Sequence, residues 1–238
     1  MKILSKVLTP VWNFIHGFWL CIKQLFLTVF GKIRIYRYPM WLVYDPKGYD
    51  LTADKVRKIM RIIQPGDVIC RRYNNFLDGY FIPGRFSHSG VYIGETDDTG
   101  DARVIIHAMG DGVQMIDILD FVRCDGIAIL RPKCDDEMKK KALERAKSYL
   151  GYTYDFNFDI LDDYKNSDEV DVHSKSMYCH EMTRSCYPDL NVPTITPSIW
   201  NGMIRSSKRQ FLAQSFFDSP DFELIYDSDY SDPRCSIK

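Results

Sequence analysis

The chain has 238 residues and a formal net charge of -1, with 31 basic and 32 acidic side chains. This balance excludes the basic surface that is typical of nucleic-acid-binding proteins, so we expect no nucleic-acid partner. Hydrophobic residues make up 45% of the chain and aromatic residues 14%, a composition typical of a globular protein with a packed core. The length suits one sizeable domain with a short extension.

Seven cysteines are present, and their spacing contains no CxxC pair and no recognisable disulfide framework. The odd number leaves at least one thiol free under any pairing. We therefore expect reduced thiols in a reducing compartment, and neither a zinc ribbon nor a thioredoxin-type motif.

Residues 7–30 form a mostly apolar segment. Thr9 and Pro10 predict a helix start, because a capping hydroxyl is followed by proline at the first helical position. The polar residues of the segment fall within one arc of about 140° around that helix. An amphipathic helix at a membrane interface fits this one-sided arrangement and the lysines and arginines on both sides of it.

Two other interpretations of residues 7–30 stay open. A transmembrane anchor fits the length, because about 20 apolar residues cross a bilayer, although Lys23 argues against it. The helix can also pack on the rest of the protein. A cleaved secretory signal is disfavoured because no small-residue cleavage site follows. We expect a membrane surface as a partner, and membrane association on the cytoplasmic face.

The rest of the chain predicts an α+β class, because strands in series are followed by helices. Apolar residues share one face of the predicted helix at 52–63. Acidic residues begin the predicted helix at 135–150, as the helix dipole favours. In chain order the predicted elements are helix 52–63, strands 68–71, 89–93, 102–108 and 113–116, helical turn 117–122, strand 127–131, helix 135–150, a long acidic loop at 157–175, helix 178–186, a short helix capped by Ser198, and strand 222–226.

Three residues in this arrangement can perform nucleophilic chemistry. His88 opens one predicted strand, His107 ends the next, and Cys179 begins a helix. A helix N-terminus lowers the pKa of a thiol, and an imidazole can take its proton and return it to a leaving group. A third polar group orients that imidazole, and adjacent antiparallel strands can place His107 beside His88. Free N–H groups at the helix start can stabilise an oxyanion.

Other interpretations of these residues are structural or metal-binding. Cys179 can be a small buried hydrophobe, His88 a strand-end histidine bonded to backbone, and His107 a half-buried cross-strand partner. Together with His180, the same three residues are also suitable zinc ligands. The spacing alone does not separate these alternatives.

Five short strings occur in an order that resembles a known group of enzymes. They are GDVI (66–69), FSHSGVYIG (86–94), VIIHAMGDGV (104–113), AKSYLGYTYDFNF (146–158) and MYCHEM (177–182). The order resembles the YaeF/YiiX-like amidases, permuted papain-like members of the NlpC/P60 superfamily. The lecithin retinol acyltransferase-like proteins share this permutation. The similarity spans residues 64–230.

The resemblance implies a permuted papain-like fold, with an antiparallel sheet packed on helices that include the nucleophile helix. It implies Cys179 as the nucleophile, His88 as the base and His107 as the orienting residue. Tyr154 would line the site and help to bind the oxyanion, or it is a tyrosine that only packs in the core. The expected domains are an N-terminal amphipathic or membrane-anchoring helix and linker (1–50), a hydrolase domain (51–230) and a flexible tail (231–238).

One position departs from the group, which usually reads Tyr-Cys-Ser-Glu at the nucleophile. Here His180 follows Cys179, where it can crowd the cleft or donate charge to the thiolate. Tyr178 and His180 are therefore candidate contacts for the substrate or the oxyanion. Glu181 matches the residue of the group, and we expect it to form structural hydrogen bonds next to the site.

The expected function is a cysteine hydrolase that cleaves an amide or ester bond through an acyl-enzyme, without a cofactor. The alternatives are a lipid acyl hydrolase or acyltransferase, which the N-terminal apolar helix favours, and a non-catalytic binding module that keeps the fold. The substrate would be a peptide or a lipid-like molecule. The sequence carries no signal for the oligomeric state.

Overall fold

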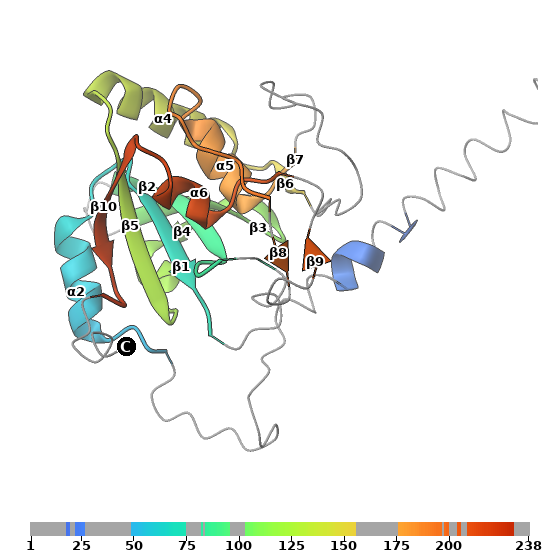
Figure 1. Cartoon of the computed structure of the whole chain (residues 1–238), viewed down its shortest axis with the longest axis horizontal. Coiled ribbons are helices and arrows are strands. Elements are labelled where there is room, and N and C mark those ends of the chain that lie inside the picture. Colours follow the sequence, from blue (N-terminus) through green and yellow to red (C-terminus); the bar gives the residue numbers. More distant parts are fainter. Residues whose placement is uncertain are drawn as a thin grey trace, which may run out of the picture.

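A six-stranded sheet organises the chain, here seen in a computed structural model (Figure 1). The strand order is β10-β5-β1-β2-β3-β4, and each neighbouring pair is antiparallel. The structure describes residues 18–19, 22–26, 49–74, 82, 84–95, 103–155, 176–196, 198–199, 204–205 and 209–230. The predicted loop at 157–175 and the predicted tail at 231–238 lie outside the described residues, as do most of the N-terminal segment and linker.

The predicted helices and strands between residues 52 and 186 are confirmed, with small shifts of their ends, as is the strand at 222–226. The sheet consists of β1 Val68–Arg72, β2 His88–Glu95, β3 Arg103–Met109, β4 Gly112–Asp117, β5 Gly126–Pro132 and β10 Phe222–Asp227. The helices are α2 Ala53–Ile62, α3 Ile118–Phe121, α4 Asp136–Ser148, α5 Cys179–Cys186 and α6 Ala213–Phe217. Short strands β6 Thr153–Tyr154 and β7 Ser176–Met177 form a parallel pair.

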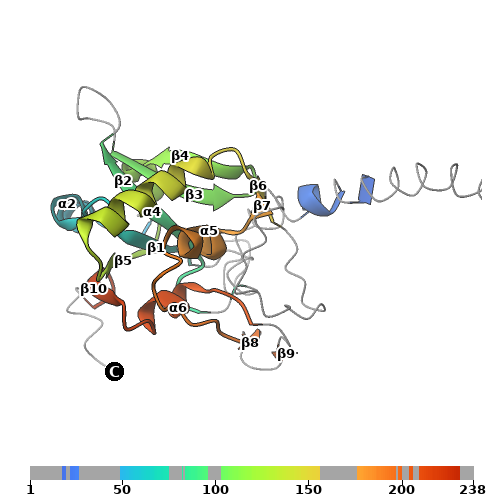
Figure 2. The same ribbon diagram turned by 90° about the horizontal axis from the view of Figure 1, so that it is seen from above.

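Helices cover both faces of the sheet (Figures 1 and 2). Side chains alternate along each strand, so every buried strand supplies apolar groups to two cores. On one face Val91 and Ile106 pack in the same cluster as residues of α4, α5 and α6. On the other face Tyr92 and Ile105 pack with residues of α2 and α3. The predicted α+β class is therefore confirmed.

The end of the chain differs from the prediction. Ser198 does not cap a helix, because Ser198–Ile199 form β8, which pairs with β9, Ile204–Arg205. A short helix, α6, comes later and was not predicted. The apolar Leu212 precedes it in place of a capping residue, and the Leu212 N–H donates to Ser215 Oγ at 3.0 Å. The sequence therefore lacked the usual start signal.

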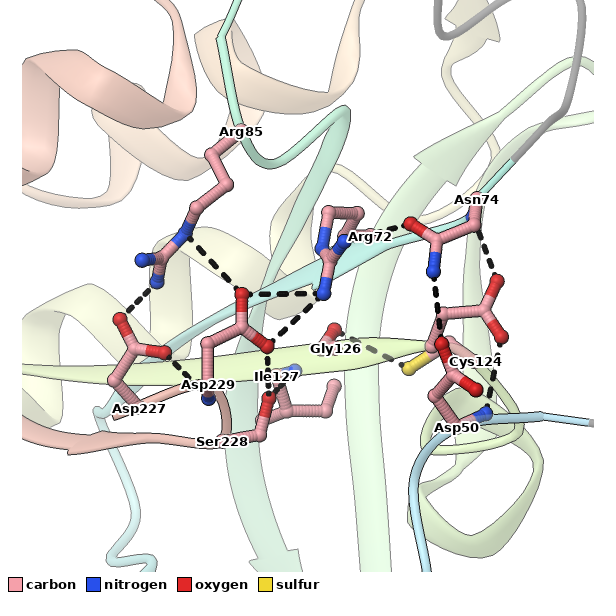
Figure 3. A network of polar contacts seen from close by, with 11 residues as sticks. Asp50, Arg72, Asn74, Arg85, Cys124, Gly126, Ile127, Asp227, Ser228 and Asp229 are labelled. Atoms are coloured by element: carbon pink, nitrogen blue, oxygen red, sulfur yellow. Dashed lines mark hydrogen bonds and ion pairs between the residues drawn. The ribbon is translucent and has the colours of Figure 1, made fainter. Parts of the chain in front are cut away.

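A polar network holds the segment that leads into β2 (Figure 3). Arg85, three residues before the strand, pairs with Asp227 and lies 3.8 Å from a carboxylate oxygen of Asp229. Arg72, at the end of β1, donates to Asp229 at 2.9 Å and to Asn74 at 2.6 Å. These bonds tie the entry of β2 and the end of β1 to the last residue of β10 and to Asp229 just after it.

The described part of the N-terminal segment is helical at residues 18–19 and 22–26. Its large side chains are mostly exposed, for example Trp19 at 62% and Leu25 at 66%. In the described part of the chain, no helix is both long and apolar enough to cross a bilayer. The remainder of residues 7–30 lies outside the described residues.

Gly112, at the start of β4, lies against the segment that leads into β6. Its φ is +108°, and a Cβ there would lie 2.4 Å from the Tyr152 carbonyl oxygen. The adjacent Val113 N–H donates to that same oxygen at 2.8 Å, and the Gly151 N–H donates to Val113 O at 3.0 Å. These bonds hold the chain that enters β6 against the edge strand β4.

We predict that Gly112→Ala destabilises the fold more than Gly84→Ala. Both glycines have a positive φ, which costs an alanine about 1–2 kcal/mol, but only Gly112 faces a backbone atom within 4 Å. The clash adds about 1–3 kcal/mol, as overpacking does elsewhere. Urea denaturation measures both variants, and equal losses in the free energy of unfolding would contradict the close approach.

Candidate active site

Cys179 is the first residue of α5, as predicted, and its side chain is buried. Tyr178 has extended backbone angles and precedes the helix as its N-cap residue. The Tyr178 N–H donates to Glu181 Oε2 at 3.3 Å, so this carboxylate closes the first turn. Burial raises the pKa of Glu181 to about 7. Glu181 thus supports the helix start, in line with the expectation.

Three donors surround the Cys179 sulfur. The backbone N–H groups of Ser89 and His180 and the side chain of Tyr154 hydrogen bond to it, and these bonds lower its pKa. Burial acts in the opposite direction and is the larger effect, so the pKa rises to about 11. The lowering predicted from the helix N-terminus is therefore outweighed, and the resting sulfur is a neutral thiol.

A buried serine joins β2 to the first turn of α5. Ser89 Oγ lies 2.8 Å from His180 Nδ1 and 2.9 Å from Thr183 Oγ1. Thr183 Oγ1 also donates to the Cys179 carbonyl oxygen at 2.9 Å. Ser89 and Thr183 were missed in the sequence, although Thr183 lies four residues after Cys179, on the same side of the helix. These bonds fix the nucleophile helix on the sheet.

The His180 ring lies inside the domain rather than in a cleft. The residue is 2% exposed, and burial lowers its pKa to about 3, so the ring carries no charge near neutral pH. It therefore neither crowds the site from outside nor donates charge to a thiolate, the two effects considered from the sequence. Its contact with the Cys179 sulfur is made by the backbone N–H.

The structure brings His88 and His107 together on neighbouring strands. His88 Nε2 lies 2.9 Å from His107 Nδ1, and both residues are buried. Their rings pack on Phe121 of α3, with centroids 5.8 and 5.7 Å from its ring. This contact agrees with the prediction that antiparallel strands place the two histidines side by side.

Both imidazoles are neutral in the folded chain. Burial lowers the pKa of His88 well below its usual value, and it lowers that of His107 to about 3, with a further contribution from Arg71 in each case. One proton lies between the two rings. When His88 Nε2–H donates to His107 Nδ1, the other nitrogen of His88 keeps a free lone pair, which a general base requires.

No hydrogen bond joins the Cys179 thiol to either imidazole within the described residues. The Ser89 side chain points to α5, whereas the neighbouring His88 ring packs on α3. Consecutive residues on a strand point to opposite faces of the sheet. The sulfur contacts the backbone N–H of Ser89, whereas the side chain of His88, the residue before it, points to the other face. Catalytic hydrogen bonds are often long before substrate binds.

The two tyrosines lie in different surroundings. The Tyr154 side chain hydrogen bonds to the Cys179 sulfur. The Tyr178 hydroxyl accepts the Phe211 N–H at 3.0 Å and holds the segment before α6. Of these two candidates for oxyanion contact, Tyr154 is the one whose side chain contacts the Cys179 sulfur.

Arg71 is a site residue that the sequence did not reveal. It lies in β1 directly opposite His88, is 4% exposed, and has its guanidinium carbon 4.4 Å from the Phe121 ring centroid. Its charge lowers the pKa values of His88, His107 and Cys179. The available signal was an arginine within a strand whose other residues predict burial.

No group of three or more His, Cys, Asp or Glu side chains in the described ranges is arranged to hold a metal ion. Of the four ligands of the zinc alternative, His88 and His107 bond to each other, and His180 Nδ1 faces Ser89.

Residues 62–226 match the family of permuted papain-like amidase enzymes YaeF/YiiX, family C92. The chain belongs to this family. The match covers more than half of the chain and includes the sheet up to the penultimate residue of β10, α4, α5 and every candidate site residue. The resemblance to the YaeF/YiiX-like amidases seen in the sequence is thereby confirmed.

A solved structure supports the same fold. The crystal structure of the metalloprotein yiiX from Escherichia coli O157:H7 aligns with a TM-score of 0.52 and 17% sequence identity. The alignment covers 68% of this chain and 96% of the bacterial one. No curated protein sequence matches the chain. At this identity the likeness shows a shared permuted papain-like fold.

We predict that acid weakens the fold through its buried neutral histidines. The unfolded chain protonates His107 below its usual pKa of 6.5, whereas the folded chain does so only near 3. The contribution of the neutral His107 ring to the free energy of unfolding is complete above pH 6.5. It is lost as the pH falls towards 3, at about 1.4 kcal/mol per pH unit. Urea denaturation of His107→Gln should give a correspondingly shallower pH dependence of the free energy of unfolding. An unchanged slope would contradict a neutral His107.

Proposed function

We propose that the protein is a cysteine amidase in which Cys179 attacks an amide carbonyl and His88 is the base. The observation that carries the proposal is the set of three donors, Ser89 N–H, His180 N–H and the Tyr154 side chain, around a cysteine at a helix start. Once the sulfur has attacked, the oxyanion forms next to it, within reach of such donors. Membership of an amidase family supports the same chemistry.

The resting charges favour general-base catalysis over a preformed ion pair. The thiol is neutral because of burial, and so is His88. In the proposed first step the Cys179 proton passes to the lone pair of His88 while the S–C bond forms and the carbonyl electrons move to oxygen. The imidazolium then donates from Nε2 to His107 Nδ1, across the 2.9 Å contact.

The next steps return the proton. His88 gives it to the amide nitrogen as the C–N bond breaks, which releases the amine and leaves a thioester on Cys179. Water then attacks the thioester, with His88 accepting its proton and returning it to the sulfur as the C–S bond breaks. The cycle requires no cofactor. It requires His88 and the thiol to approach each other when substrate binds.

We predict that Cys179→Ala abolishes hydrolysis. The assay is a panel of fluorogenic peptide amides, extended with esters and phospholipids, and the expected loss of rate is at least about 10³-fold because the nucleophile is gone. Cys186→Ala is the matched control. Cys186 is a buried cysteine at the other end of α5, outside the proposed site, so its variant should retain the wild-type rate.

Activity that persists in Cys179→Ala would overturn the assignment of the nucleophile. A wild-type chain that binds members of the panel and hydrolyses none would favour a non-catalytic module that keeps the fold.

The N-terminal helix supports a second proposal, that the site works at a lipid surface and takes acyl-lipid substrates. Phe18, Trp19, Leu25 and Phe26 are each more than 60% exposed on the described helical residues. Aromatic and aliphatic side chains of this kind insert between headgroups, and the flanking lysines attract anionic lipids. On this proposal the protein lies on the cytoplasmic face of a membrane, where its thiols stay reduced.

We predict that replacing Phe18, Trp19, Leu25 and Phe26 together by serine abolishes flotation with phosphatidylcholine–phosphatidylserine vesicles. The reason is the loss of the apolar groups that would enter the bilayer. Replacing the exposed Met115, Leu119 and Leu224 by serine is the control, because these residues are also 45–56% exposed but lie on the hydrolase domain. Equal flotation of the N-terminal variant and the wild type would contradict the membrane proposal.

A further inference from the structure

We infer that Arg71 is a positioning residue for the His88–His107 pair, through its place opposite His88 and the Phe121 ring that all three share. The inference rests on the proposed function of His88 as the base. It adds a residue on β1 to a site otherwise built from β2, β3, β6 and α5. Arg71 reaches the chemistry through the histidines and does not contact the substrate.

The strand register fixes the first contact. Arg71 and His88 are direct partners in the antiparallel pairing of β1 and β2. Side chains at such positions point to the same face, with Cβ atoms about 4.5–5.5 Å apart. Ser89, the next residue, points to the opposite face and bonds to α5. Arg71 therefore shares its face with the histidine pair rather than with the sulfur.

Phe121 is the common platform. Its buried ring lies 4.4 Å from the Arg71 guanidinium carbon and 5.8 and 5.7 Å from the centroids of His88 and His107. Arg71 also donates to Met109 Sδ at 3.4 Å. Met109 follows His107 by two residues and so faces the same side of β3. The guanidinium thus reaches from β1 towards β3 beside both rings.

The charge of Arg71 acts on every proton of the proposed relay. The pKa of His88 is lowered by Arg71 on β1, His107 on β3 and His180 on α5. From α3 the ring of Phe121, which is uncharged, packs against it. A cation at this place disfavours the imidazolium and favours a negative sulfur. Arg71 therefore helps to keep His88 available as a base at acidic pH, in addition to holding its ring.

The test is an NMR titration of the His88 imidazole in the free, full-length protein, which requires no turnover. In Arg71→Met, His88 should begin to protonate at a pH about one unit higher than in the wild type, because a nearby like charge is gone. Arg71→Lys, which keeps the charge, should restore the wild-type titration.

Arg103→Met is the matched control. Arg103 lies on β3, four residues before His107 and on the same face of the strand. The distance along the strand is about 13 Å, which is longer than the distance over which salt screens a charge. Its loss changes the net charge equally and should leave the His88 titration unchanged. An unchanged titration in Arg71→Met, or the same shift in Arg103→Met, would overturn the inference.

Arg71→Lys also decides the question if Arg71→Met does not fold. An ammonium cannot stack on Phe121 as a planar guanidinium does, so the His88 ring should be held less firmly in its buried place. We expect kcat to fall about 10- to 100-fold, while the pH at which activity is lost on the acid side stays as in the wild type. Wild-type kcat would contradict the positioning role. Because the titration is read without substrate, failure of this inference and failure of the amidase proposal give different results.

Discussion

The alternation of side chains at the start of β2 is the constraint on which the site depends. Ser89 faces α5 and fixes the turn that carries Cys179, while His88 faces α3 and meets His107. A shift of one residue in the register of β2 would exchange these roles, because it moves every side chain to the other face. The polar network around Arg85, just before the strand, helps to hold that register.

Burial decides the charges in this site. It raises the pKa of the Cys179 thiol and lowers those of His88, His107 and His180, so the resting groups are neutral. A buried ion pair loses its solvation, and the three donors around the sulfur do not offset the effect of burial on its pKa. In the proposed mechanism, charge separation therefore follows substrate binding. The donors at the helix start then stabilise the negative charge, whereas Arg71 disfavours the imidazolium and keeps His88 neutral until that step.

The elements were predictable where local signals agree with the fold. Asp135 caps α4 as an acidic first turn suggests, with the Met138 N–H donating to its carboxylate at 2.7 Å. The order of the strings around His88 and Cys179 indicated both the family and the pair of histidine strands. By contrast, α6 has no polar cap, and Ser198 looked like a cap but begins a strand.

The rest of the site follows from tertiary contacts that no local pattern records. Arg71 reaches the histidines only because β1 and β2 pair in one register, and the interior position of His180 depends on Ser89 from a distant strand. The thiol pKa was misjudged for the same reason. The helix N-terminus is visible in the sequence, whereas the burial that outweighs it is a property of the packed domain.

The most direct test of the account is a crystal structure of the protein with a peptide aldehyde. The account predicts a hemithioacetal on Cys179, with its oxygen bound by the His180 N–H and the Tyr154 side chain, and the His88 ring turned to hydrogen bond with the sulfur or the new oxygen. A Cys179 thiol that stays unmodified at saturating aldehyde, or an adduct with His88 still packed on Phe121 and out of reach, would contradict it.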